Sequence, residues 1–153
     1  MKKLLKTCCD PALMPLRIVV GIIFVVHGSG KLFGAFGGPG IAGVTQFLAG
    51  LGFQGVAWAW LLACGEFFGG LFLLFGFLTR IAAIDIAIVM LVAITKVHWS
   101  NGLTGQGGYE YPLALFAAAL TLLIAGGGKW SVDACLSEKC CQTGSSSGGT
   151  CCS

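Results

Sequence analysis

The sequence predicts an all-α membrane protein, a four-helix bundle with a short interfacial or re-entrant helix between the first and second spans. The 153 residues are 56% hydrophobic and only 10% charged, with a mean hydropathy of +0.90. A soluble domain carries roughly 25% charged residues, so this chain has too few to cover a water-exposed surface. Its apolar runs are continuous, which favours helices over the alternating strands of a membrane barrel.

Four apolar segments are each near the roughly 20 residues that a helix needs to cross a bilayer. They cover residues 16–36, 56–78, 81–97 and 109–125. The glycine-rich connection after the first segment is half apolar, and we expect a short helix there over residues 41–51. The expected organisation is an N-terminal segment (1–14), one membrane domain (15–133) and a disordered tail rich in Cys, Ser and Gly (134–153).

Basic residues are distributed unevenly between the two sides of the expected bundle. Neither the loop over 37–55 nor that over 99–108 contains Lys or Arg, whereas seven basic residues fall on the opposite side: Lys2, Lys3, Lys6, Arg17, Arg80, Lys129 and Lys139. The positive-inside rule then places both termini in the cytoplasm and the protein in the inner (plasma) membrane. A net charge of +3 is too small and scattered to indicate nucleic-acid binding. Residues 1–30 also imitate a secretory signal, but the expected first helix continues past them.

The stretch HGSGKLF at residues 27–33 looks at first like a phosphate-binding loop. That motif requires glycine where Val25 stands and Ser or Thr where Leu32 stands, and no strand precedes it. What remains is His27 and Lys31, spaced i and i+4 on one face of a membrane helix. Ionisable groups at such depth are costly and usually face an interior or a cavity.

Several ionisable residues are expected at similar depth. With 1.5 Å of rise per residue, Lys31 lies roughly 21 Å outward from Arg17, and Glu66 roughly 21 Å outward from Arg80. Gly65 and Gly69 form a small-xxx-small pair that lets helices approach closely. A pocket in the outer third of the bundle is therefore predicted, formed by His27, Lys31, Glu66, Lys96, His98, Tyr109 and Glu110.

The roles of these residues allow two interpretations. In one, Lys31, Glu66 and Glu110 are the catalytic set of a pocket for a small polar or quinoid molecule, or part of a proton path. In the other, a Lys–Glu pair only fixes helix register. Asp85 lies about 7.5 Å in depth from Arg80, and we expect these two to pair as structural residues at the inner end.

Five short motifs resemble those of the DoxX family of small four-helix membrane proteins. They are HGSGKLF at 27–33, GE at 65–66 with GG at 69–70, GFLTR at 76–80, GYEYPL at 108–113 and GKWSVD at 128–133. The resemblance implies the membrane component of a redox system. Some relatives are subunits of a thiosulfate:quinone oxidoreductase, and others are associated with resistance to quinones, reactive chlorine or thiol stress. It points to Lys31, Glu66, Arg80, Tyr109 and Glu110 as functional positions, and implies a soluble or membrane redox partner.

The chain has eight cysteines, many of them in the tail. Thiolates bind soft metals such as Cu(I) and Zn(II), so one alternative is a soft-metal-handling or transport protein that uses Cys135, Cys140, Cys141, Cys151 and Cys152. The other alternative is that the cysteine-containing tail is a dispensable extension. The sequence contains no haem-attachment, flavin or iron–sulfur motif, so electrons would come from a partner. Quinone is the expected cofactor under the first hypothesis, homo-oligomerisation is left open, and a non-catalytic scaffold is a third hypothesis.

Overall fold

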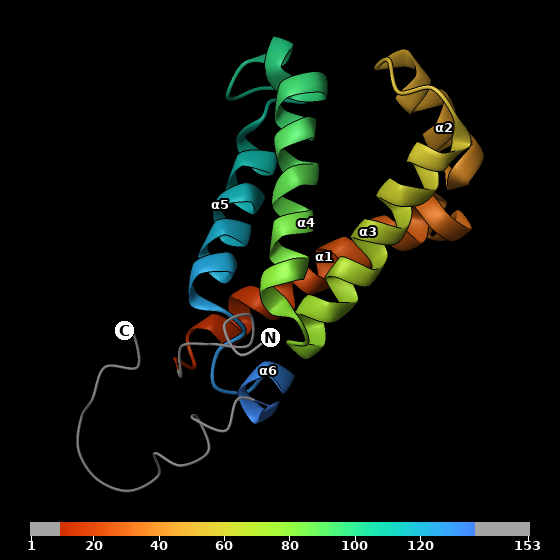
Figure 1. Ribbon diagram of the computed structural model, residues 1–153. Coiled ribbons are helices and arrows are strands. Elements are labelled where there is room, and N and C mark those ends of the chain that lie inside the picture. Colours follow the sequence, from red (N-terminus) through yellow and green to blue (C-terminus); the bar gives the residue numbers. More distant parts are fainter. Residues whose placement is uncertain (1–9, 137–153) are drawn as a thin grey trace, which may run out of the picture.

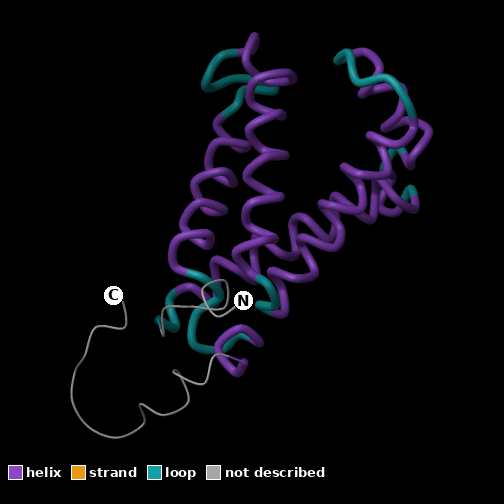
Figure 2. The backbone as a smooth tube through the Cα atoms, in the orientation of Figure 1, coloured by secondary structure: helices purple, strands orange, loops and turns teal. Residues whose placement is uncertain are grey.

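The computed structural model describes residues 10–136, which form helices and connecting loops without a strand (Figure 2). The α-helices are α1 (Leu13–Phe33), α2 (Gly40–Gly50), α3 (Val56–Phe75), α4 (Thr79–Val92), α5 (Glu110–Ala125) and α6 (Val132–Leu136). Three helical stretches, Leu13–Phe33, Val56–Phe75 and Thr79–Asn101, are long and apolar enough to cross a membrane, and α5 is a shorter apolar helix. The predicted all-α fold is confirmed.

The helices are arranged as two arms that meet at one end and diverge at the other (Figure 1). In one arm α1 packs along α3, with α2 against both; in the other α4 packs along α5. The arms join through the α3–α4 contact, close to α6. We call this the α6 end and the opposite, diverging end the open end.

Glycines allow α1 and α3 to approach each other closely. A Cβ atom on Gly70 would lie 2.6 Å from the backbone nitrogen of Val25, and one on Gly21 would lie 2.9 Å from the carbonyl oxygen of Gly70. Real Cβ atoms do not come this close to backbone, so only glycine fits at these positions. Of the two glycines in the HGSG stretch, Gly28 serves the same purpose, since it lies against the backbone of Phe67, whereas Gly30 lies against Ala35 and Gly38 in the loop after α1.

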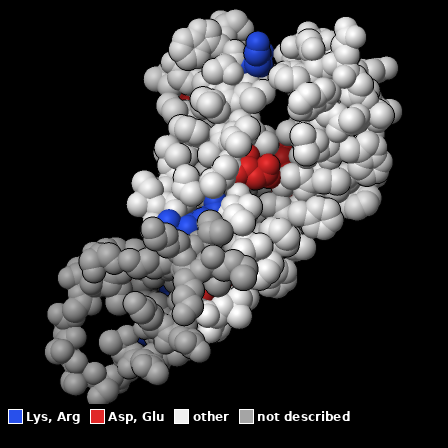
Figure 3. Space-filling model, in the orientation of Figure 1, with Lys and Arg blue, Asp and Glu red and all other residues white. Residues whose placement is uncertain are grey.

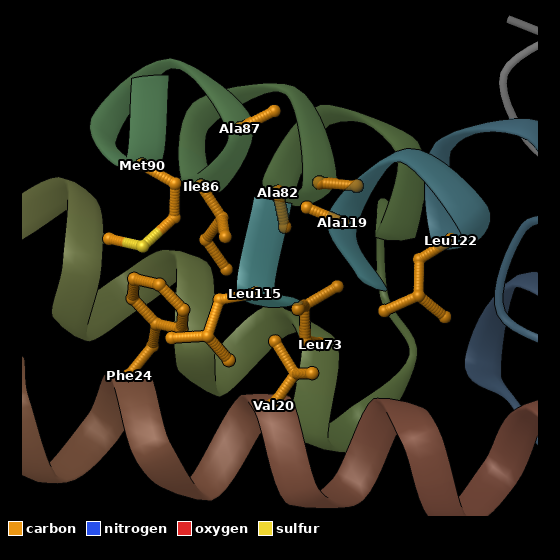
Figure 4. Packing of buried hydrophobic residues seen from close by; sticks show 11 residues of the cluster. Val20, Phe24, Leu73, Ala82, Ile86, Ala87, Met90, Leu115, Ala119 and Leu122 are labelled. Carbon is orange, nitrogen blue, oxygen red and sulfur yellow. The ribbon is translucent and has the colours of Figure 1, made fainter. Parts of the chain in front are cut away.

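The main hydrophobic core lies where the two arms meet (Figure 4). Val20 and Phe24 from α1 and Leu73 from α3 pack against the α4–α5 arm. Small residues, including Ala83 and Ala119, are fully buried between α4 and α5, which lets these two helices pack tightly.

Two details of the helices differ from the sequence-based prediction. The first helix ends at Phe33 instead of residue 36, because Gly34 adopts a left-handed conformation (φ 68°) and donates its N–H to Gly30; this is a common way for a helix to end. The third span does not stay α-helical to its end, since residues Ala93–His98 form a π-helix. π-helical turns are rare and often lie at functional sites.

Buried polar contacts hold the α6 end together. The Asp133 carboxylate, 1% exposed, accepts hydrogen bonds from the backbone N–H groups of Leu78 and Thr79, both at 2.8 Å. These amides begin α4, so Asp133 caps that helix from a distance in sequence. Arg17, 3% exposed, donates to the carbonyl oxygens of Gly127 (2.6 Å) and Trp130 (2.7 Å).

Candidate functional site

An ion pair between Lys31, near the end of α1, and Glu66, in the middle of α3, links the two helices. The Lys31 ammonium donates to Oε1 of Glu66, whose side chain is 3% exposed, whereas that of Lys31 is 25% exposed. The carboxylate is thus enclosed and the ammonium reaches the edge of an internal space. The sequence-based expectation that these two residues lie at equal depth is consistent with this contact.

The pair lies in the wall of a cavity of about 450 Å³ between the two arms. The volume falls within the range of roughly 300–1,000 Å³ that small-molecule pockets occupy. All four long helices and α2 contribute to its lining, which is mostly apolar and aromatic, with Phe24, Phe53 and Trp58 among the rings. Figure 3 shows a notch between the arms with acidic side chains at its bottom. The arrangement is an apolar chamber with ionisable groups concentrated in one part.

Asp85 of α4 supplies the second carboxylate of this cavity. Its side chain lies against Gly65 and Gly69 of α3: a Cβ atom on these glycines would be 2.9 and 3.1 Å from Oδ2 of Asp85. The glycine pair therefore makes room for a side chain as well as for a helix. The sequence-based expectation paired Asp85 with Arg80 at the inner end. In the structure Asp85 lies against α3 and lines the cavity, and Arg80 donates to the carbonyl oxygen of Ile124 at 2.9 Å.

One oxygen of Glu66 has no hydrogen-bond partner among residues 10–136. Its Oε2 atom is buried and accepts no hydrogen bond from any described residue. Leaving a buried acceptor unsatisfied costs roughly 1–3 kcal/mol, and more for a charged group. Glu66 is one of the cavity-lining residues, but Oε2 itself is buried, so a donor in the cavity reaches this oxygen only if the Glu66 side chain turns toward it.

The cavity includes some of the predicted pocket residues and leaves others outside. His27, Lys31, Glu66 and His98 line it, and Tyr111 does so in place of Tyr109. His98 also contacts the carbonyl oxygen of Gly107 through Nδ1 at 2.6 Å.

Three predicted residues do not line the cavity: Lys96, Tyr109 and Glu110. Lys96 and Glu110 are exposed, and the Tyr109 ring stacks on Trp99 with centroids 5.7 Å apart. Matching residues by their expected depth in the membrane brought together Lys31 of α1 and Glu66 of α3, which do form a contact. It could not give the rotation of α4 and α5, which decides which side chains face inward.

Sequence reasoning treated Arg17 only as an orientation signal and did not assign a role to Asp133 or Asp85 in the site. A signal was present, because GFLTR at 76–80 and GKWSVD at 128–133 are the motifs that meet at the α6 end. Similarly, an aspartate in an otherwise apolar span indicated a costly charge that needed a partner or a cavity.

Four of the five expected metal ligands lie outside the described residues. Within residues 10–136 no group of three or more His, Cys, Asp or Glu side chains could hold a metal ion. Cys135 is exposed in α6, while Cys140, Cys141, Cys151 and Cys152 lie outside the described residues.

Fold and site together define a helical membrane protein with an internal, mostly apolar cavity that contains an ion pair and a second carboxylate. The chain belongs to the DoxX family, whose model matches residues 12–99. It is 33% identical over 107 residues to the Bacillus subtilis protein named "Putative oxidoreductase CatD", covering 70% of this chain and 75% of that protein.

Two further relatives are membrane proteins by name. The inner membrane protein YqjF of Escherichia coli is 33% identical over 132 residues, which is 85% of this chain and 95% of that protein. An uncharacterized membrane protein of Mycobacterium tuberculosis is 30% identical over 152 residues, with 88% of this chain and 86% of the relative covered. No solved structure shows a significant match.

Proposed function

We propose that this protein is the quinone-binding membrane component of a redox or stress-detoxification system. The observation that carries the proposal is the 450 Å³ cavity, whose apolar lining includes the Lys31–Glu66 ion pair. A quinone headgroup is a flat, mostly apolar ring with polar atoms at two ends. Such ligands fit pockets that combine an apolar wall with a few placed polar groups.

The Lys31 ammonium is suited to hold a quinone carbonyl. An ammonium has three N–H donors, and one of them goes to Glu66. The side chain is partly exposed and lines the cavity, so further donors can reach a carbonyl oxygen there. Glu66 lies beside it and is placed to accept or supply a proton when the ring changes its oxidation state.

Electrons come from a partner protein in this proposal. Conversion of a quinone to a hydroquinone takes two electrons and two protons. The similarity to a relative with "oxidoreductase" in its name supports a redox setting. The family resemblance also implies an alternative, a thiol-linked redox system in place of a quinone-linked one.

The proposed orientation places the open end on the outer side of the membrane. Arg17, Arg80 and Lys129 lie in or next to segments that meet near α6, and a Cβ atom on Gly128 would be 3.0 Å from the carbonyl oxygen of Asp10. Both ends of the described chain thus lie at the α6 end, which fits the proposal that α5 crosses the membrane as a fourth span. Together with the positive-inside rule this favours cytoplasmic termini.

Photoaffinity labelling with an azidoquinone tests the proposal in protein reconstituted in nanodiscs. We expect labelled peptides from cavity-facing parts of α3 and α4, and loss of label with excess unmodified quinone. Val89→Trp, which fills the cavity, should reduce labelling at least tenfold. Val19→Trp is the matched control, because Val19 is 56% exposed and does not line the cavity. Equal labelling of both variants would contradict the proposal.

A further inference from the structure

The ionisable part of the cavity contains more hydrogen-bond acceptors than its fixed donors can satisfy. Two carboxylates, Glu66 and Asp85, line the cavity together with one ammonium, that of Lys31. An ionised carboxylate only accepts hydrogen bonds. Oε1 of Glu66 is bonded to Lys31, while the buried Oε2 receives no hydrogen bond from a described residue.

The two carboxylates come from opposite arms and meet over the same stretch of α3. Asp85 projects from α4 toward Gly65, the residue directly before Glu66, and toward Gly69 one turn further along. Figure 3 shows acidic side chains gathered at the bottom of the notch. Because glycines replace side chains here, the Asp85 carboxylate can lie against α3 without displacing Glu66.

Other polar groups of the cavity do not remove this excess. His98 is engaged with the carbonyl oxygen of Gly107, and His27 is exposed. Tyr111, which is 51% exposed, lies in the first turn of α5 at the open end. Lys31 has N–H donors beyond the one bonded to Glu66, but two carboxylates face this one ammonium. A ligand bound beside Glu66 and Asp85 should therefore bring donors of its own.

We propose that Glu66 and Asp85 together accept hydrogen bonds from the hydroxyl groups of a hydroquinone-type ring, so that the cavity binds the reduced ligand more tightly than the oxidised one. The inference rests on the proposed quinone-binding function and adds the preferred redox form. A quinone offers only acceptors at its two polar ends, whereas a hydroquinone offers two O–H donors. Hydrogen bonds to charged acceptors are about twice as strong as those between neutral groups.

This preference for the hydroquinone would favour reduction of the bound quinone over oxidation of the bound hydroquinone. A site that binds the hydroquinone more tightly than the quinone makes the bound quinone easier to reduce, by the ratio of the two affinities. It also places two proton acceptors next to the hydroxyl groups from which protons must leave on oxidation. No electron transfer is needed to test the preference, because binding alone reveals it.

The test is calorimetric titration of the full-length protein in nanodiscs under anaerobic conditions. Three ligands with the same methylated ring are compared: trimethylhydroquinone, its dimethyl ether and the corresponding quinone. We expect the hydroquinone to bind at least tenfold more tightly than either of the others. The dimethyl ether keeps the ring and the oxygens but cannot donate, so it isolates the hydrogen bonds.

Asp85→Asn should reduce the preference for hydroquinone over its ether at least fivefold without weakening quinone binding. Asp10→Asn is the matched control, since Asp10 is exposed and lies at the α6 end. Circular dichroism and gel filtration check that each variant is folded, and the ligand comparison on the wild-type protein decides the question even if Asp85→Asn does not fold.

Each outcome separates the inference from the proposed function. Equal affinity for quinone, hydroquinone and ether overturns the carboxylate proposal and leaves quinone binding in place. Binding of none of the three by folded protein overturns both. A benzylamine of the same size that binds more tightly than the hydroquinone would show that the two carboxylates serve a cation, which also overturns the inference.

Discussion

The two ends of the bundle use buried charges in opposite ways. At the α6 end, both oxygens of Asp133 accept backbone N–H groups, and two nitrogens of Arg17 donate to carbonyl oxygens. One nitrogen of Arg17, Nε, is also buried without a described partner, but Arg17 does not line the cavity. Glu66 does line it, and has one oxygen on Lys31 and one without a described partner. Charges that are bonded to the backbone fix a structure, whereas a charge with spare bonding capacity beside a cavity is available for a ligand.

The packing of the helices also differs between the two ends. Near α6 the two arms share a core of fully buried residues such as Leu73, Ile86 and Leu122. Towards the open end the arms diverge (Figure 1), and the space between them is the cavity. We infer that the α6 end acts as the rigid base that holds the two halves of the site at a set separation.

The largest expected effect on stability comes from removing the polar contacts of Asp133 at the α6 end. Asp133→Ala removes two hydrogen bonds to a charged acceptor, each worth roughly 1.5–3 kcal/mol. It also leaves the turn at Leu78, a non-glycine residue with φ 48°, without its fixed partner. We expect a loss of about 3–6 kcal/mol in the free energy of unfolding, measured by denaturant titration in detergent. Asp10 is the control, because it is an exposed aspartate that also accepts a backbone N–H; Asp10→Ala should cost less than about 1 kcal/mol. A similar loss of stability in both variants would show that the buried contacts of Asp133 are not special.

A smaller effect is expected from the contact between α1 and α3. Gly70→Ala would place a methyl group 2.6 Å from the backbone nitrogen of Val25, so the helices must separate. We expect a destabilisation of about 1–3 kcal/mol, together with weaker ligand binding because Lys31 and Glu66 come from these two helices. Gly50→Ala is the control, since nothing lies within 4 Å of its added carbon; if it destabilised the protein as much, close helix packing would not be the cause.

The smallest effect should come from Lys96, although sequence reasoning placed it in the pocket. The residue is exposed and does not line the cavity. Lys96→Met should change quinone affinity less than twofold in the same calorimetric titration. A tenfold loss would mean that the π-helical turn that carries Lys96 rotates toward the cavity when ligand binds.

Much of the fold could be predicted because its causes are local in sequence. Apolar length gives the spans, and the glycine-rich connection gave the short helix over 41–51, which the structure places at Gly40–Gly50. The distribution of Lys and Arg gave an expected orientation, which remains a prediction. The left-handed Gly34 and the π-helix at Ala93–His98 depend on tertiary packing, and the apolar pattern contains no signal for either.

The site was predicted only in part, for a geometric reason. Rise per residue fixes depth along a helix, so Lys31 and Glu66 could be matched. Rotation about the helix axis and the neighbour relations of the helices are not set by depth. For that reason Glu110 was included although it is exposed, and Asp85 was assigned to the inner end although it faces Gly65 and Gly69.

The central claim is that the Lys31–Glu66 pair serves a ligand and is not needed to hold the fold. The most direct test is the double variant Lys31→Met with Glu66→Gln, which removes both charges while keeping the shapes of the side chains. We predict that its free energy of unfolding stays within about 1 kcal/mol of the wild-type value, because a buried pair and well-packed neutral residues are often equivalent in stability. Its affinity for the quinone and for the hydroquinone should fall at least tenfold in calorimetric titration. A protein that is strongly destabilised, or one that is stable and still binds both ligands as tightly as the wild type, would contradict the account.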